Sequence, residues 1–304
     1  MNRLPSSRFE ASQSSPVIVA TDGREQSDGA LRAGALFGGS TDAWRVVSAS
    51  PLITNVAPEF DLGITAEAND VLRDRQHQLV QDQIRRVGVA TDIDVEIGSG
   101  SAVLVVSASA STRNAALIIA GLGRHKVVDR LLGDETALAI IRATDKPVLA
   151  VPQDFAEMPR NAVVGIDFSD PSICAAQLAL RFTHEAATIY LVNVAPRENV
   201  LSTVTGGLTA YELRARSELE LVASRLDIPP RMHVQAVVRQ GDPGSELLRY
   251  AEDVEAQLIA VGTRGQGFLA RLFLGSVATK VVRASPIAVL TVPTRHTSKD
   301  REDG

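Results

Sequence analysis

The sequence predicts an α/β protein made of two tandem modules, each a doubly wound sheet of parallel strands. Short apolar runs alternate with segments whose apolar residues recur every three or four positions, and this alternation repeats in the second half of the chain. Aromatic residues make up only 4% of the 304 residues. The core must therefore be built from Ala, Val, Leu and Ile, which suits helices packed closely on a sheet.

Two pairs of matching segments define the repeat. Val17–Asp22 is an apolar run that closes on an aspartate, and it recurs as Val163–Asp167, with an offset of 145 between the two aspartates. Leu117–Gly121 recurs as Leu258–Gly262 with an offset of 141. Because order and spacing agree over nearly the whole of each half, we infer a duplicated module of about 140 residues.

The repeat also predicts the domain boundaries. In chain order these are a tail over 1–15, a first module over 16–152, a linker over 153–160, a second module over 161–293 and a tail over 294–304. The first tail is rich in serine and the second in charged residues, so both are expected to be solvated and flexible.

The elements of the second module follow in order from its apolar pattern. Val163–Ile166 is expected to form a buried strand, after which Asp170 and Pro171 supply an N-cap and a first helical position. The later elements are a strand over Ile189–Val194, a helix from Tyr211 to Leu226, a strand over Val234–Val238, a helix near Ser245–Val254, a strand over Leu258–Val261, a helix after Ser276 and a strand over Ile287–Val292. Apolar strands that alternate with helices are typical of a parallel sheet covered on both faces.

Charge and composition narrow the class of protein. Residues 1–152 carry 15 Lys and Arg against 18 Asp and Glu, and residues 153–304 carry 16 against 18, so neither half has the basic excess of a nucleic-acid binder. A single cysteine, Cys174, excludes an internal disulfide and is expected to pack as a small apolar residue. No apolar run approaches the roughly 20 residues that cross a bilayer, and Met1–Ser15 lacks the apolar centre of a secretory signal. We therefore expect a cytoplasmic protein that binds neither membrane nor nucleic acid.

A glycine pattern follows the strand Leu258–Val261. Gly262–Gly265 is separated by nine residues from Gly275, and Ser276 follows directly, which gives the spacing G-x2-G-x9-G-S. Glycines let the backbone approach a ligand, Ser276 is expected to cap the next helix, and free N–H groups at a helix start bind anions. With Arg264 and Arg271 nearby, the expected occupant is a polyphosphate, although a glycine-rich connection without a ligand explains the same residues.

These residues resemble the ATP-binding pattern of the universal stress protein family. The likeness rests on Asp167, Asn193–Val194, Gly262–Gly265 and Gly275–Thr279, and it extends over both modules. It implies Rossmann-like, adenine nucleotide alpha hydrolase-like modules, each a five-stranded parallel sheet. It also implies that ATP, usually with Mg²⁺, lies at the carboxyl edge of the sheet.

The resemblance assigns a role to each matching position. Ile166 and Asp167 would approach adenine and ribose, Val194 would line the adenine pocket, and Gly262, Gly265, Gly275 and Ser276 would hold the phosphates, with Arg264 and Val277 as further contacts. Asp167 has a second, compatible explanation as a polar cap between strand and helix.

The first module departs from this pattern. Gly121 matches the first glycine, but Arg124, Asp134 and Glu135 stand where the second module has Gly, Gly and Ser. A shift of one residue lets Gly133 take the glycine position, yet an acid still follows it. Because carboxylates repel phosphates and also stabilise a helix start without any ligand, this module is expected to bind ATP weakly or not at all.

Other chemistry has little support in the sequence. There is no P-loop motif, and no catalytic Ser/His/Asp set can be proposed from sequence order. The five histidines, His77, His125, His184, His233 and His296, lack metal-ligand spacing. Arg124, His125 and Lys126 form a small basic cluster, which is explained by a solvated loop or by an acidic partner.

Three functions remain open at this point. The chain is expected to act as an ATP-responsive stress or signalling module. The alternatives are a very slow ATP hydrolase and a nucleotide-independent interaction scaffold. The closing strands Val148–Val151 and Ile287–Val292 are expected at sheet edges that need covering. The resemblance suggests that the two modules pair through these edges as an internal pseudo-dimer, and that two chains pair further as a homodimer.

Overall fold

The computed structural model describes residues 15–39, 41–54, 64–90, 92–123, 133–195, 207–263 and 274–293. The described chain divides into two compact units between Glu157 and Met158. The part before this boundary is called the N-terminal module, and the part after it the C-terminal module.

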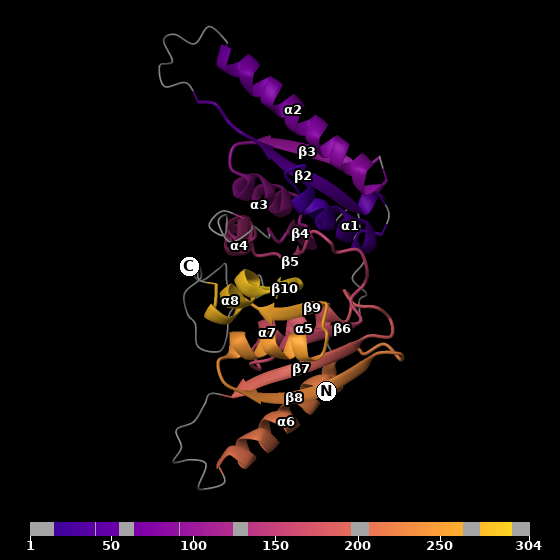
Figure 1. Cartoon of the computed structure of the whole chain (residues 1–304), viewed down its shortest axis with the longest axis vertical. Helices are drawn as coiled ribbons and strands as arrows, with labels where there is room; N and C mark the ends of the chain where they lie inside the picture. Colours follow the sequence, from indigo (N-terminus) through magenta and orange to yellow (C-terminus); the bar gives the residue numbers. More distant parts are fainter. Residues whose placement is uncertain are drawn as a thin grey trace, which may run out of the picture. The chain divides into compact units, whose positions relative to one another are not determined.

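The N-terminal module alternates strands and helices along the chain (Figure 1). Its strands are β1 (Val17–Ala20), β2 (Trp44–Ser50), β3 (Asp94–Ser99), β4 (Leu117–Gly121) and β5 (Val148–Val151). Its helices are α1 (Asp28–Phe37), α2 (Ile64–Val87), α3 (Ala102–Thr112) and α4 (Gly133–Ala143), with the short 3-10 helices η1 (Glu25–Ser27) and η2 (Thr41–Ala43). The strands pair in parallel in the order β3-β2-β1-β4-β5.

The C-terminal module repeats this plan. Its strands are β6 (Asn161–Gly165), β7 (Thr188–Ala195), β8 (His233–Gln240), β9 (Leu258–Gly262) and β10 (Ala288–Val292). Its helices are α5 (Asp170–Ala179), α6 (Gly207–Arg225), α7 (Pro243–Asp253) and α8 (Ser276–Ala284). The strands again pair in parallel, in the order β8-β7-β6-β9-β10. The doubly wound α/β fold predicted for both modules is confirmed.

The helices cover both faces of each sheet because the winding direction reverses after the third strand. Right-handed crossovers place the first two helices of a module on one face and the last two on the other. Accordingly α1 packs beside α2 and α3 beside α4, and in the other module α7 packs beside α8. The central strands are buried on both faces, as Val17, Ile18 and Val19 show with no exposed surface.

The start of helix α5 differs from the expected one by one position. Asp170 is the first helical residue and Pro171 the second, while the N-cap is Ser169. Ser169 has an extended backbone, with φ −80° and ψ 155°, so the chain turns into the helix one residue earlier than predicted. Cys174 lies on this helix and is half-buried.

The segment after β5 packs on the N-terminal module. The Arg32 guanidinium donates to the Gln153 carbonyl oxygen at 2.8 Å, and the rings of Phe37 and Phe155 lie 6.1 Å apart. Phe155 is buried. The first residues of the expected linker therefore contribute to the core around α1.

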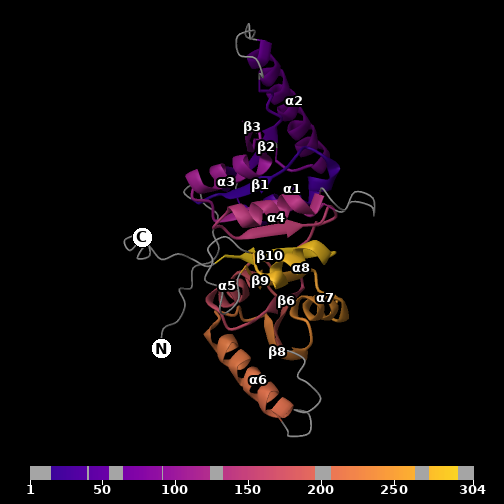
Figure 2. The same cartoon turned by 90° about the vertical axis from the view of Figure 1, so that its left-hand side faces the viewer.

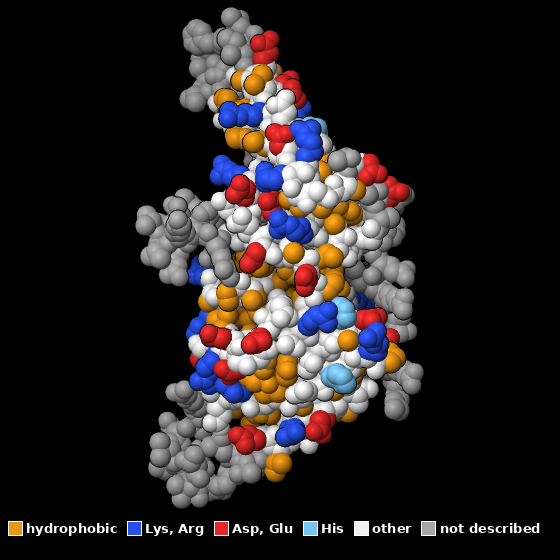
Figure 3. All heavy atoms as spheres, turned by 45° about the vertical axis from the view of Figure 1, so that its right-hand side comes forward, with side chains coloured by type: hydrophobic (Ala, Val, Ile, Leu, Met, Phe, Trp, Pro, Cys, Tyr) orange, Lys and Arg blue, Asp and Glu red, His pale blue; other side chains and the backbone are white. Residues whose placement is uncertain are grey.

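Helix α2 extends beyond its sheet (Figure 2). Its buried side chains, Val80, Gln83 and Ile84, all lie in its C-terminal part, while the residues before them are exposed or half-buried. Within the described residues, no helix is both long and apolar enough to cross a membrane. On the face drawn in Figure 3, basic and acidic side chains are interspersed, which offers a phosphate backbone no continuous contact surface there.

Candidate functional site

In each module the candidate site lies where the first and fourth strands end side by side. The chain leaves these two strands in opposite directions along the sheet, which is the point where ligands bind in doubly wound folds. In the C-terminal module these strands are β6 and β9, and in the N-terminal module they are β1 and β4.

The end of β6 holds Ile166 and presents Asp167 to solvent. Ile166 is buried, and its amide donates to the Val192 carbonyl oxygen at 2.8 Å, which continues the strand pairing by one residue. Phe168 has φ +64°, a left-handed conformation that turns the chain at this point. The Asp167 Oδ1 atom accepts hydrogen bonds from the Ser169 amide and hydroxyl. The aspartate therefore shapes the turn while its side chain stays exposed.

The buried side-chain amide of Asn193 contacts this turn. The sequence assigned Asn193 to the site only through the family resemblance. The Asn193 side chain donates through Nδ2 to the Ile166 carbonyl oxygen at 2.8 Å. Its Oδ1 atom accepts from the Tyr211 hydroxyl at 3.2 Å, so α6 is linked to the site. Val194 follows on β7 and is half-buried. The sequence indicated Tyr211 only as part of a helix face. Its contact with Asn193 joins two different elements, so the helical pattern could not reveal it.

The first glycine of the pattern has a packing role within the chain. A Cβ atom at Gly262 would lie 2.8 Å from Pro171 Cβ and 3.0 Å from the Ser172 amide nitrogen. At the matching Gly121, a Cβ would lie 3.2 Å from the Gln26 carbonyl oxygen and 3.3 Å from Ser27 Cα. Both glycines therefore let the fourth strand of a module approach the start of its first helix, whether or not a ligand is bound.

Helix α8 begins without a side-chain cap. Its N-cap is Gly275, and Ser276 is the first helical residue, so the expected capping role of Ser276 is wrong. The Gly275 amide donates to the Thr263 carbonyl oxygen at 2.8 Å, which brings the chain back to the end of β9. Ser276 is exposed and Val277 is half-buried. Among the residues that the structure describes, no side chain therefore caps the first-turn N–H groups of α8.

Some of the expected contacts lie outside the described residues. These are Arg264, Gly265 and Arg271 in the C-terminal module, and Arg124, His125 and Lys126 in the other, together with the side chains of Asp134 and Glu135. The other expected residues lie at the carboxyl ends of neighbouring strands or at the adjoining helix start. They are Ile166, Asp167, Val194, Gly262, Gly275, Ser276 and Val277.

An ion pair joins α8 to the start of α7. Asp242 is the N-cap of α7, where its Oδ1 atom accepts from the Ser245 amide at 2.9 Å and from Lys280 Nζ at 2.6 Å. The hydrogen bond from Lys280, followed by those from Ser245, lowers the pKa of Asp242 from 3.8 to about 2. Because the folded-state pKa is depressed, Asp242 stabilises the fold above about pH 4, and this contribution is lost as pH falls through about 2.

Replacing Lys280 by methionine is expected to reduce this acid-range dependence. Because the pair is largely exposed, Lys280→Met should lower the free energy of unfolding by only a few tenths of a kcal/mol at about pH 5. This difference from the parent should vanish near pH 2. Urea unfolding of the parent and the variant across this range measures it. Lys146→Met is the matched control, because Lys146 Nζ donates to the uncharged Asn114 Oδ1 atom at 2.7 Å. An identical pH dependence in the parent and Lys280→Met would contradict the assignment.

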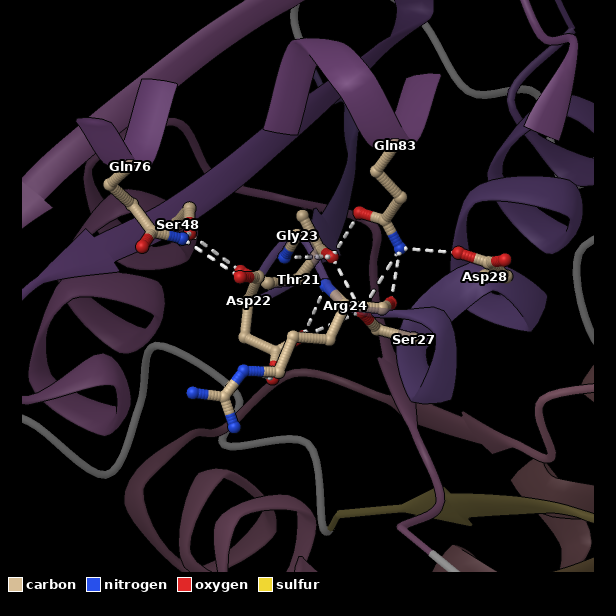
Figure 4. A network of polar contacts seen from close by, with 9 residues as sticks. All are labelled: Thr21, Asp22, Gly23, Arg24, Ser27, Asp28, Ser48, Gln76 and Gln83. Atoms are coloured by element: carbon tan, nitrogen blue, oxygen red, sulfur yellow. Dashed lines mark hydrogen bonds and ion pairs between the residues drawn. The ribbon is translucent and has the colours of Figure 1, made fainter. Parts of the chain in front are cut away.

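The corresponding edge of the N-terminal module carries a buried polar network centred on Gln83 of α2 (Figure 4). The Gln83 side chain has no exposed surface. Its Oε1 atom accepts from the Thr21 hydroxyl at 2.6 Å, and its Nε2 atom donates to the Arg24 carbonyl oxygen at 2.9 Å, to Ser27 Oγ at 3.1 Å and to Asp28 Oδ1 at 2.9 Å. One amide therefore contacts both ends of the turn that follows β1.

A second glutamine of α2 reaches the same turn. Gln76 Nε2 donates to the Asp22 carbonyl oxygen at 3.0 Å and to Ser48 Oγ at 2.9 Å. Ser48 in turn donates to the Thr21 carbonyl oxygen at 2.7 Å. Gln76 and Gln83 are seven residues apart and so share one face of the helix, which is the only signal of this network in the sequence.

The two modules differ chemically at matching positions of this edge. With the offset of 145, Asp22 matches Asp167, but Thr21 replaces Ile166 and Ser48 replaces Asn193. Among the described residues, no group of three or more His, Cys, Asp or Glu side chains is placed to hold a metal ion.

Comparisons with known proteins agree with the duplicated fold. The family model described as "Universal stress protein family" matches residues 14–152 and 158–293. A universal stress protein of Methanocaldococcus jannaschii is 30% identical over 142 residues, which cover 44% of this chain and 81% of that protein. One from Mycobacterium tuberculosis is 28% identical over 182 residues, which cover 57% of this chain and 60% of that protein. The crystal structure of a universal stress protein from Archaeoglobus fulgidus is similar with a TM-score of 0.63 and 19% identity, over 92% of this chain and 97% of that one. This last likeness concerns the fold alone.

Proposed function

The chain belongs to the universal stress protein family, and on that premise we propose that its C-terminal module binds ATP and acts as a nucleotide-responsive stress or signalling module. One observation carries the proposal: within the described residues no side chain caps α8, which begins at Ser276 at the sheet edge where Asp167 is exposed. A helix start with free N–H donors is a natural anion site, and a nearby carboxylate can accept hydrogen bonds from a ribose.

The other expected residues fit parts of the same ligand. Ile166 and the half-buried Val194 offer apolar surface at the ends of β6 and β7, where adenine would lie. Gly275, Ser276 and Val277 would hold the phosphates through their backbone, with Arg264 and Gly265 in the preceding segment. Asn193, held by Tyr211, would keep the ends of β6 and β7 in register for the base.

In this proposal Mg²⁺ would be bound mainly through the nucleotide and not by a set of protein ligands. The described residues offer no cluster of carboxylates, so the ion would be held mainly by phosphate oxygens and water. It would supply charge neutralisation for the phosphates. No residue of the described part is assigned to activating water, and any hydrolysis of ATP is expected to be very slow.

The proposal also covers how the modules and chains assemble and where the protein is located. β5 and β10 each end the strand order of their module, and such strands need a partner or a cover. Pairing of the two modules as a pseudo-dimer would provide it, and linkage in one chain raises their effective concentration. A homodimer of two chains and a cytoplasmic location belong to the same proposal. The alternative, a nucleotide-independent scaffold, draws support from the packing role of Gly262.

Calorimetric titration of Mg-ATP into nucleotide-free protein, compared with Ser276→Glu, tests the proposal. Glutamate in the first turn of α8 favours the helix but repels phosphate, so the affinity for ATP should fall at least about tenfold without loss of thermal stability. Ser276→Gln is the matched neutral control and should remain within about threefold of the parent. No binding to the parent would favour the scaffold, and an unchanged affinity in Ser276→Glu would place ATP elsewhere.

A further inference from the structure

The N-terminal module has an exposed apolar surface on the outer side of α3 and α4, which lie side by side (Figure 2). Residues 98–112 contain the whole of α3 and include no Lys, Arg, Asp or Glu. Leu104 of α3 is 70% exposed, and Ala108, one turn further along the same side, is also exposed. Val103 of α3 and Ala139 of α4 are half-buried. These four residues define the α3/α4 face, and apolar side chains gathered on an exposed face are typical of a protein contact.

The matching face of the C-terminal module is charged. At the offset of 141, the residues that replace Leu104, Ala108 and Ala139 are, in order, Ser245, Arg249 and Lys280. All three are exposed on α7 and α8. Because the two modules share one fold, packing inside a module does not require apolar residues at these positions. The apolar character of the α3/α4 face therefore points to a contact with a second molecule.

The two ends of the α3/α4 face carry opposite charge. The sequence places Asp134 and Glu135 in the first turn of α4. Arg142 lies in the last turn of the same helix and is exposed. Each helix returns from the carboxyl edge of a parallel sheet, so α3 and α4 run in the same direction. The face is therefore acidic where the helices begin, basic where α4 ends and apolar between these ends.

This arrangement is self-complementary. A two-fold axis that lies in the contact and crosses both helices near their middle sets each helix antiparallel to its copy. Arg142 of each chain then lies beside Asp134 and Glu135 of the other, and opposite ends of the helix dipoles meet. Ala108 and Ala139 lie near the middle of their helices, where small side chains let two helices approach closely. The charges therefore favour a second copy of this chain as the partner.

We propose that two chains form a two-fold symmetric dimer through the α3/α4 faces of their N-terminal modules, with Ala108 close to the axis and Leu104 buried on either side of it. The inference rests on the proposed homodimer and assigns the surface that forms it. It does not depend on ATP, because the contact includes no residue of the nucleotide site in the C-terminal module.

Sedimentation equilibrium of the full, nucleotide-free chain tests this dimer. The parent should have twice the mass of one chain. Ala108→Arg brings two arginines together near the axis and should weaken the dimer at least about tenfold. The fold accommodates arginine here, since Arg249 occupies the matching position, and an unchanged melting temperature checks this. Ala35→Arg, at an exposed alanine of α1, is the matched control and should leave the dimer intact.

A leucine pair tests the apolar part of the contact. Leu104→Ser removes the most exposed large side chain of the face and should also weaken the dimer at least about tenfold. Leu213→Ser is the matched control, because this leucine of α6 is 65% exposed but lies outside the face. Its dimer should remain within about threefold of the parent.

A charge exchange tests the antiparallel orientation. Arg142→Glu sets like charges at both ends of the contact and should weaken the dimer about tenfold. Adding Asp134→Lys and Glu135→Lys restores unlike charges at both ends, so the affinity should return to within about threefold of the parent. Failure of this rescue would overturn the antiparallel pairing.

A parent that remains monomeric up to about 100 μM overturns the proposal and the homodimer with it, and means that another part of the chain or another protein covers the face. A dimer that is unchanged in Ala108→Arg and Leu104→Ser overturns only the assigned surface, since the homodimer would then form elsewhere. Neither result bears on ATP binding, which Ser276→Glu tests separately.

Discussion

Replacing Gln83 by leucine is expected to lower the free energy of unfolding by about 2–4 kcal/mol. Leucine is of similar size but leaves the partners of a fully buried amide without their hydrogen bonds. The Thr21 hydroxyl loses an acceptor, and the Arg24 carbonyl oxygen and the Asp28 carboxylate each lose a donor. Each lost hydrogen bond costs about 1 kcal/mol, and the bonds of Gln83 to Thr21, Arg24, Ser27 and Asp28 are lost together.

The same helix supplies the matched control for this variant. Gln78 of α2 is exposed, so Gln78→Leu should change the unfolding free energy by less than about 0.5 kcal/mol. Urea unfolding followed by circular dichroism measures both variants. Equal effects at the two positions would mean that the Gln83 network does not hold the turn after β1.

Gly29→Ala is expected to destabilise the N-terminal module by about 3 kcal/mol. Alanine normally favours a helix over glycine by about 1 kcal/mol, so a loss would reverse the usual sign. Gly29 lies on α1, where a Cβ atom would sit 1.9 Å from the Pro152 carbonyl oxygen and 3.1 Å from that of Gln153. The backbone after β5 would have to move away, and the hydrogen bond from Arg32 to Gln153 would be lost with it.

Thermal unfolding of Gly29→Ala beside Ala35→Ser tests this packing. Ala35 is exposed on the same helix, so its substitution should have little effect. A Gly29→Ala protein as stable as the parent would show that the segment after β5 does not pack tightly on α1.

The sequence by itself determined the architecture of each module. Strand and helix signals depend on local periodicity, so the runs Val163–Ile166 and Leu258–Val261 could be placed to within a residue or two of β6 and β9. The duplication was visible for the same reason, since Asp22 and Asp167 follow equivalent strands. Two local details were wrong: α5 is capped by Ser169 rather than by Asp170, and α8 by Gly275 rather than by Ser276. Cap positions depend on the backbone angles of a single residue, which a pattern of residue types does not specify.

Only the tertiary structure decided what several of these residues touch. The glycine pattern suggested approach to a ligand, yet the contact at Gly262 is with Pro171 and Ser172, which lie far away in the sequence. Gln83 looked like one more polar residue on a charged helix, and its burial depends on how α2 docks on the turn after β1, more than fifty residues earlier. Periodicity records which side of a helix or strand is apolar. Which partners meet there is set by the packing of elements distant in the chain.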